Sequence, residues 1–119
     1  LRDAGLSIAI GTDVAGGRSF RIPHALSKTY DNALATGSSL NVAELLWLGT
    51  RGGALALGHN QCGTIEPGMK ADFICVERPE WAETPDQVLA QCLFFAEAPP
   101  VRKTWIDGKC VWSRSNGEK

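Results

Sequence analysis

One acidic residue, Asp13, begins a glycine-rich turn and has the position expected of a catalytic or metal-binding group. The surrounding segment reads Ile-Gly-Thr-Asp-Val-Ala-Gly-Gly at residues 10–17. A carboxylate in such a place can bind a metal ion or transfer a proton. Aspartate and glycine are also favoured in ordinary turns, where the aspartate hydrogen-bonds its own loop. Position alone leaves both interpretations of Asp13 open.

The element that must position Asp13 is the apolar segment at residues 6–10. Large aliphatic side chains alternate there with small residues, as in a strand packed on both faces. Asp13 would then follow the carboxyl end of this strand, where parallel α/β proteins bind their ligands. Such a strand needs hydrogen-bonded neighbours, each reached through a crossover of about a dozen residues or more. We therefore expect the neighbouring strands to lie outside this chain.

A phosphate-binding loop is the competing interpretation of the same segment. Gly11 and Gly16 have the glycine spacing of that motif, with four residues between them. Gly17 and Arg18 stand where the motif requires a lysine and a hydroxyl residue. Both the phosphate-binding cation and the magnesium ligand are therefore missing, which excludes this loop type.

The remaining candidate residues have simpler structural explanations. His24 lies near the start of a predicted helix and is expected to be a surface or loop-contacting residue, while Trp47 is expected to pack. The cysteines lack the paired C-x-x-C spacing of a zinc or redox motif and are expected to be free thiols. A turn and a strand edge account for Glu66 and Asp72. The cysteines are Cys62, Cys75, Cys92 and Cys110.

Composition indicates an ordinary globular protein. The chain has 119 residues, of which 44% are hydrophobic, and a formal net charge of -1. Arg18 and Arg21 are too few to form a basic patch, so nothing indicates binding to nucleic acid or an anionic membrane. No apolar run approaches the roughly 20 residues of a membrane span, and there is no secretory leader. The sequence predicts a soluble, cytoplasmic protein.

Two helical regions are expected after the Asp13 loop. The first spans residues 24–36 and ends at Gly37, a typical helix C-terminal residue. The second spans residues 42–57, with Ser39 or Asn41 as its N-terminal cap. It should break near the glycine pair at 52–53, where a close backbone approach is expected, and its largely apolar surface should be buried between layers.

The second half of the chain is expected to form turns, short strands and one helix. We predict a turn at residues 66–68, a strand at 72–77 and a helix at about 85–97. Thr84 and Gln87 have the spacing of a capping box for that helix. The final prediction is a hairpin of residues 101–106 and 109–112, joined by Asp-Gly. A subdomain boundary is placed at residue 58.

Several stretches resemble the amidohydrolase superfamily, and within it most closely the guanine deaminases. Residues 4–20 resemble the last barrel strand and the loop that follows it. Residues 50–58 resemble the helices after that strand, residues 63–76 the re-entry into the flanking β domain, and residues 105–112 its closing hairpin. The resemblance runs in order along nearly the whole chain.

The resemblance implies an α/β fold. The chain would be a carboxyl-terminal fragment of a (β/α)8 amidohydrolase barrel plus part of the flanking β-sandwich domain. Residues 1–57 would supply the last barrel strand and terminal helices, and residues 58–119 part of the composite sandwich. The missing amino-terminal part of the enzyme would supply the other strands, and family members are often homodimers.

The resemblance also implies a zinc-dependent deamination of the purine base guanine to xanthine and ammonia. Asp13 matches the family's aspartate, which binds the metal and transfers the proton. Gly16 and Gly17 would let the backbone pass close to the substrate, although a turn needing positive φ explains them equally well. His24 and His59 match none of the family's histidine ligands. The chain alone is therefore expected to be inactive and to hold no zinc.

Two alternatives stay open. The first alternative is another enzyme of the superfamily. Chlorohydrolases and other aminohydrolases share the aspartate and have a motif similar to Glu-Pro-Gly-Met-Lys-Ala-Asp at residues 66–72. The chain could instead be a non-catalytic module that docks on a partner through its open edges and apolar faces. The substrate-binding residues are unknown in either case.

Overall fold

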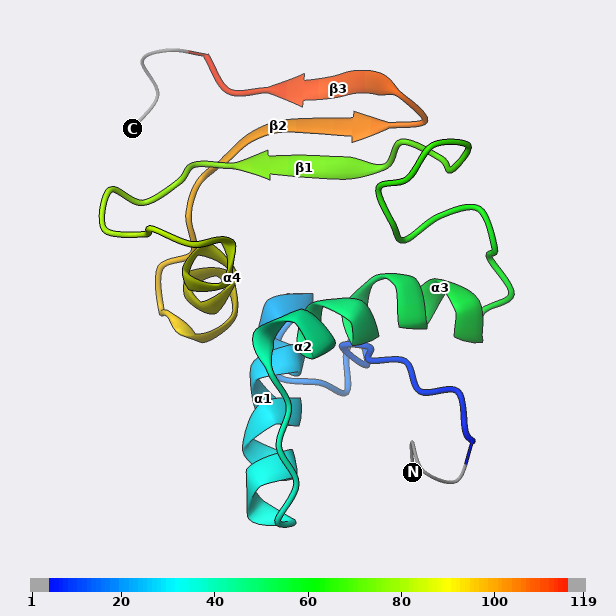
Figure 1. Cartoon of the computed structure of the whole chain (residues 1–119), viewed down its shortest axis with the longest axis vertical. Helices are drawn as coiled ribbons and strands as arrows, with labels where there is room; N and C mark the ends of the chain where they lie inside the picture. Colours follow the sequence, from blue (N-terminus) through cyan, green and yellow to red (C-terminus); the bar gives the residue numbers. More distant parts are fainter. Residues whose placement is uncertain (1–4, 116–119) are drawn as a thin grey trace.

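A computed structural model describes residues 5–115 of the chain. Within them, four helices and three strands follow one another in a mixed order (Figure 1). They are α1 (Ile22–Ala35), α2 (Val42–Gly49), α3 (Arg51–Ala56), β1 (Phe73–Val76), α4 (Pro85–Phe94), β2 (Val101–Ile106) and β3 (Lys109–Ser113).

The three strands form one antiparallel sheet in the order β1-β2-β3. The predicted hairpin of β2 and β3 is confirmed, and β3 reaches one residue further than expected. Asp107 and Gly108 both have positive φ, 50° and 75°, as a two-residue hairpin turn requires. This turn is tied to the segment before β1, because the Asp107 N–H donates to the Asp72 carboxylate at 2.7 Å.

The first two helices begin and end close to their predicted positions. α1 starts at Ile22 rather than at residue 24, because Pro23 has the φ that a first helical turn needs. Gly37, just beyond its end, has a φ of 75°. Of the two candidate caps, Asn41 is the one used: its side chain accepts the Glu44 N–H at 2.9 Å, and Glu44 accepts the Asn41 N–H at 3.0 Å.

The break between α2 and α3 lies at Thr50, two residues before the glycine pair. A Cβ at Gly52 would lie 2.6 Å from the Trp47 ring, whereas one at Gly53 would meet only the Leu48 carbonyl at 3.5 Å. The expected close backbone approach therefore exists at Gly52. The Trp47 ring lies against Gly52 there, and 46% of Trp47 remains exposed.

The capping box of α4 is confirmed, but the helix is shorter than predicted. Thr84 accepts the Gln87 N–H at 3.3 Å, and Gln87 accepts the Thr84 N–H at 3.0 Å. The helix ends at Phe94 instead of residue 97. Phe95 adopts extended backbone there, and its ring stacks on Trp81 with 5.8 Å between centroids.

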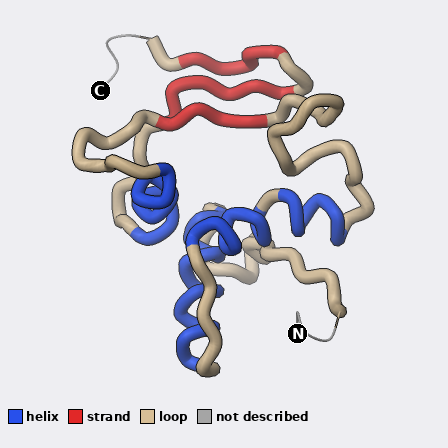
Figure 2. The backbone as a smooth tube through the Cα atoms, viewed as in Figure 1, coloured by secondary structure: helices blue, strands red, loops and turns tan. Residues whose placement is uncertain are grey.

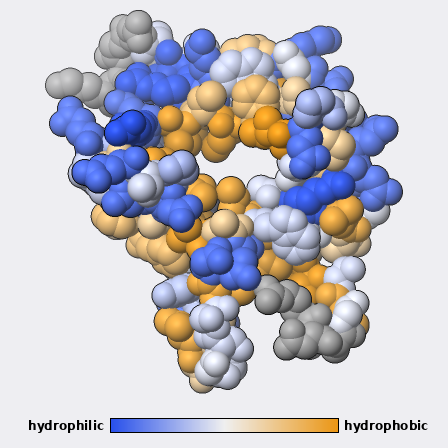
Figure 3. Space-filling view, in the orientation of Figure 1, coloured by the Kyte–Doolittle hydropathy of each residue, from blue (hydrophilic) through white to orange (hydrophobic). Residues whose placement is uncertain are grey.

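The helices and the sheet form two separate layers (Figure 2). Leu26, Leu45 and Leu93 form the buried cluster that joins α1, α2 and α4. In the described part of the chain, no helix packs closely on the sheet. Figure 3 shows an opening between the two layers, edged largely by hydrophobic residues.

Many large hydrophobic side chains remain exposed as a result. The prediction that the α2–α3 region is buried between layers is wrong for this chain, because Leu46 is 38% and Leu55 42% exposed. Strand residues show the same exposure, with Ile74 at 56% and Trp112 at 46%. No other element among the described residues covers these side chains.

The predicted strand at residues 6–10 is absent from the structure. These residues form no regular secondary structure. A strand is defined by backbone hydrogen bonds to a neighbour, and the described residues offer this segment none.

Within residues 5–115, no helix is long and apolar enough to span a bilayer.

Candidate functional site

Asp13 lies at the beginning of a tight loop that leads into α1. Its backbone is left-handed, with a φ of 49°, a conformation that aspartate tolerates better than most residues. The Asp13 carbonyl accepts the N–H groups of Gly16 at 2.9 Å and Gly17 at 2.5 Å. The side chain is exposed, and among the described residues its carboxylate has no hydrogen-bond or ion-pair partner. It is therefore accessible to a ligand.

Of the two glycines after Asp13, Gly17 is required by close packing within the loop itself. Neither has a positive φ; the left-handed residues are Asp13 and Ala15. A Cβ at Gly17 would overlap the Thr12 carbonyl oxygen, and one at Gly16 would lie 2.5 Å from the Asp13 carboxylate. The explanation by positive φ is therefore wrong. Gly17 is needed to close the loop, whereas the exposed Asp13 side chain could move away from a Cβ at Gly16.

We expect Gly17→Ala to disturb this loop strongly. The Thr12 carbonyl belongs to the backbone and cannot rotate away, so overpacking should cost about 1–3 kcal/mol or shift the loop. If Asp13 acts on a substrate in the complete protein, a displacement of about 1 Å at Asp13 should lower kcat/KM about 100-fold. Steady-state kinetics would measure this.

Gly53→Ala is the matched control for Gly17→Ala. It adds the same methyl group at a helical position where the nearest atom is at an ordinary 3.5 Å. Unchanged kinetics in both variants would show that the tight loop does not position a catalytic group.

The described residues do not form a metal site by themselves. No group of three or more His, Cys, Asp or Glu side chains in residues 5–115 could hold a metal ion. A catalytic zinc site uses three protein ligands and an open position. Asp13 can be one of these ligands, so the others would have to come from outside the described residues.

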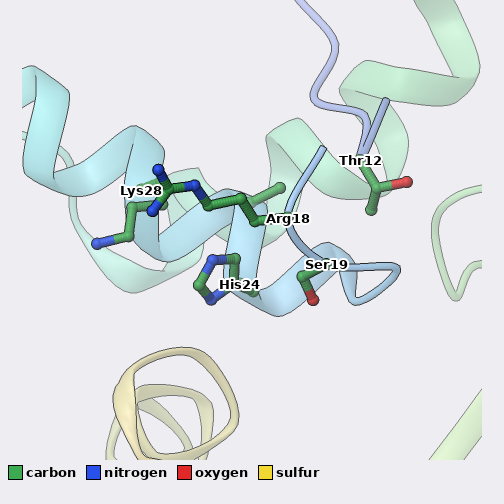
Figure 4. Close-up of a pocket in the computed structure, with 6 residues that line it drawn as sticks. Thr12, Arg18, Ser19, His24 and Lys28 are labelled. Atoms are coloured by element: carbon green, nitrogen blue, oxygen red, sulfur yellow. The ribbon is translucent and has the colours of Figure 1, made fainter. Parts of the chain in front are cut away.

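An open pocket of about 470 Å³ lies between the Asp13 loop and α1 (Figure 4). The loop and the first turns of α1 both contribute to its wall. Its charged lining is entirely basic. The lining residues are Thr12, Arg18, Ser19, His24, Ala25 and Lys28.

The basic character of this pocket was not expected from the sequence, where Arg18 and Arg21 were considered too few for a patch. A signal was present: His24 and Lys28 are four residues apart in a helix and therefore share a face. The structure brings Arg18 to that face from the loop (Figure 4). Arg21 lines a different pocket, beyond His24.

The other candidate residues have structural roles or no role in a site. Glu66 accepts the Thr64 hydroxyl at 3.3 Å, and Asp72 accepts the Asp107 N–H. All four cysteines are free thiols, as predicted. Burial raises the pKa of the Cys92 thiol, which disfavours the reactive thiolate. His59 is exposed and joins no cluster of metal-binding side chains in the described chain.

Comparison with known proteins gives relatives with different substrates, among them deaminases and imidazolonepropionases. Residues 1–111 match the model of the amidohydrolase family. A 5-methylthioadenosine/S-adenosylhomocysteine deaminase of Pelotomaculum thermopropionicum is 33% identical, over 96% of this chain and 28% of its own length. A probable guanine deaminase of Deinococcus radiodurans is 32% identical, over 93% of this chain and 28% of its own length.

Solved structures of related deaminases are also similar to this chain. Escherichia coli guanine deaminase superposes with a TM-score of 0.81 and 25% identity, over 95% of this chain and 29% of that one. An adenosine deaminase of Xanthomonas campestris with bound zinc gives a TM-score of 0.74 and 29% identity, over 92% of this chain and 26% of that one. The chain thus spans between a quarter and a third of the length of these proteins.

Proposed function

Because the chain belongs to the amidohydrolase family, we propose that it is the carboxyl-terminal part of a zinc-dependent guanine deaminase. The observation that carries the proposal is the similarity to guanine deaminases in both sequence and structure, over more than nine tenths of the chain. The reaction is hydrolytic: guanine and water give xanthine and ammonia.

The proposal assigns the two halves of the chain to two parts of a larger enzyme. Residues 1–57 would provide the last barrel strand, at 6–10, and the helices after it; residues 58–119 would belong to a composite β-sandwich. The exposed hydrophobic side chains and the opening in Figure 3 support this assignment. Other parts of the enzyme would cover these surfaces and pair with residues 6–10.

Asp13 is proposed as both metal ligand and proton carrier. Its exposed, unpaired carboxylate can accept a proton from the attacking water and return it to the leaving amine. A zinc ion, when bound, lowers the pKa of its water toward neutrality. The zinc in the related adenosine deaminase structure supports this choice of metal. The remaining ligands would come from the rest of the enzyme.

Other substrates within the family are the alternative. The names of the relatives include adenosine and 5-methylthioadenosine/S-adenosylhomocysteine deaminases, which also act on purine-containing compounds. Chlorohydrolases and other aminohydrolases are further candidates. The cytoplasmic location and a homodimer remain predictions.

The function is tested by comparing the complete protein with the 119-residue chain. We expect the complete protein to contain zinc and to release ammonia from guanine faster than from adenosine or 5-methylthioadenosine. The chain alone should be inactive and zinc-free, because it holds one ligand. Ammonia release and metal analysis measure both properties. Preference for another substrate would reassign the specificity.

A non-catalytic docking module is the second candidate, since so much apolar surface is exposed. It predicts that the 119-residue chain alone is folded, monodisperse and zinc-free. A chain that aggregates in isolation would contradict the docking module and agree with a fragment of a larger enzyme.

A further inference from the structure

We propose that the basic pocket between the Asp13 loop and α1 is a binding site for a phosphate group. Arg18, His24 and Lys28 would hold it, with Ser19 as an additional donor. The site does not use a phosphate-binding loop of the glycine-lysine type, which the sequence excludes. It is formed by side chains from the loop and from one face of a helix.

The charges lining this pocket are only partly balanced by the described residues. No acidic residue lines it. The side chains of Arg18 and His24 have no hydrogen-bond or ion-pair partner in the described part of the chain. Lys28 donates to Asp31 at 2.9 Å, but an ammonium group has three donors, so two remain.

Arg18 lies along the first turns of α1, with its guanidinium near the Lys28 side chain and the His24 ring (Figure 4). The Lys28 ammonium and the Ser19 hydroxyl point away from the guanidinium in this view. All three basic side chains are exposed, so they can rotate toward a shared ligand. Arg18 and Lys28 carry like charges in one pocket, and an anion bound between them would attract both. The pocket therefore favours an anionic ligand.

The number of donors favours phosphate over a carboxylate. A guanidinium can donate two parallel hydrogen bonds to phosphate oxygens, and the Lys28 ammonium can contact a third. The Ser19 Oγ accepts the Arg21 N–H at 3.1 Å, which leaves its hydroxyl hydrogen free for the ligand. Phosphate offers three or more oxygens to these donors, and a carboxylate offers two.

The pocket shares its loop with Asp13. Arg18 directly follows Gly17, whose close contact with Thr12 closes this loop. A phosphate bound here would therefore be held by the same loop as the reactive carboxylate. Whether that phosphate belongs to a purine nucleotide depends on the proposed function, whereas phosphate binding itself does not.

The test is calorimetric titration of the complete protein with inorganic phosphate and, separately, with guanosine 5′-monophosphate. We expect Arg18→Gln to weaken binding of both about tenfold, through the loss of charge-assisted hydrogen bonds. Lys28→Gln should act in the same direction. Lys70→Gln is the matched control, because it removes one positive charge at an exposed position outside the pocket.

The two ligands distinguish the source of the phosphate. Tighter binding of the nucleotide than of inorganic phosphate, with both weakened by Arg18→Gln, identifies a phosphate carried by a purine ligand. Equal affinities, again weakened by Arg18→Gln, identify a site for the free anion. Either result supports the phosphate site.

Two results would overturn it: no measurable binding of either ligand, or the same weakening in Lys70→Gln as in Arg18→Gln. Guanine deamination by the unmodified protein is measured in parallel. Turnover without phosphate binding rejects this site alone, and phosphate binding without turnover rejects the proposed function alone.

Discussion

Asp13→Asn in the complete protein should lower kcat/KM for guanine about 1,000-fold, within the range expected for loss of a general acid–base group. Asparagine has nearly the same shape as aspartate and also tolerates the left-handed backbone at this position, where φ is 49°. The loop conformation should therefore survive. What is lost is the negative charge and the proton acceptor, and zinc content should fall as well.

Asp107→Asn is a closely matched control. Asp107 is also exposed, also left-handed with a φ of 50°, and also begins a tight turn. Asparagine before glycine suits a hairpin turn equally well, so this variant should keep full activity. Kinetics and zinc analysis of both variants provide the comparison. Full turnover by Asp13→Asn would remove Asp13 from the reaction and leave it as a turn residue.

The second large effect is expected at Leu45. Its side chain is fully buried, with 0% exposure, and with Leu26 and Leu93 it joins α1, α2 and α4. Leu45→Ala should destabilise this three-helix unit by about 3 kcal/mol, since it removes buried methyl groups and leaves a cavity. Because 1.4 kcal/mol corresponds to a factor of ten, amide exchange in these helices should accelerate about 100-fold.

Hydrogen–deuterium exchange of the complete protein measures this effect helix by helix. Leu45→Met is the control, because it keeps the side-chain volume and should cost less than about 1.5 kcal/mol. Equal exchange rates in the two variants would show that Leu45 is not the centre of the helical core. The prediction concerns the helices only. The sheet contacts no helix closely in the described chain, so exchange in β2 and β3 should not change in Leu45→Ala.

The parts of the fold that were predicted from the sequence are those that depend on near neighbours in the chain. The capping box at Thr84 and the cap at Asn41, which was one of two candidates, join residues three apart, and the turn at residues 107–108 needs only two residues with positive φ. Each of these structures is decided by local backbone geometry and by side chains within one helical turn. Their residue types were therefore sufficient to identify them.

The parts that were wrong or missed depend on residues far apart. α4 ends early where Phe95 meets Trp81, fourteen positions earlier in the chain. The segment at residues 6–10 has strand-like residues but no strand, because pairing needs a neighbour that the described chain lacks. The role of Gly17 is an exception: Thr12 is only five positions away, but the clash with its carbonyl depends on the exact conformation of the loop.

The sequence alone was enough to determine the family, the local caps and turns, and Asp13 as the candidate residue, because ordered motifs and short-range contacts carry that information. Only the tertiary structure showed that Arg18 meets His24 and Lys28 in one pocket, and that the apolar faces are open. The pocket depends on how the loop folds back on α1 within residues 12–28, which the residue types alone do not fix. The open faces depend on how the helices and the sheet are placed in space, and that placement arises from packing between distant residues.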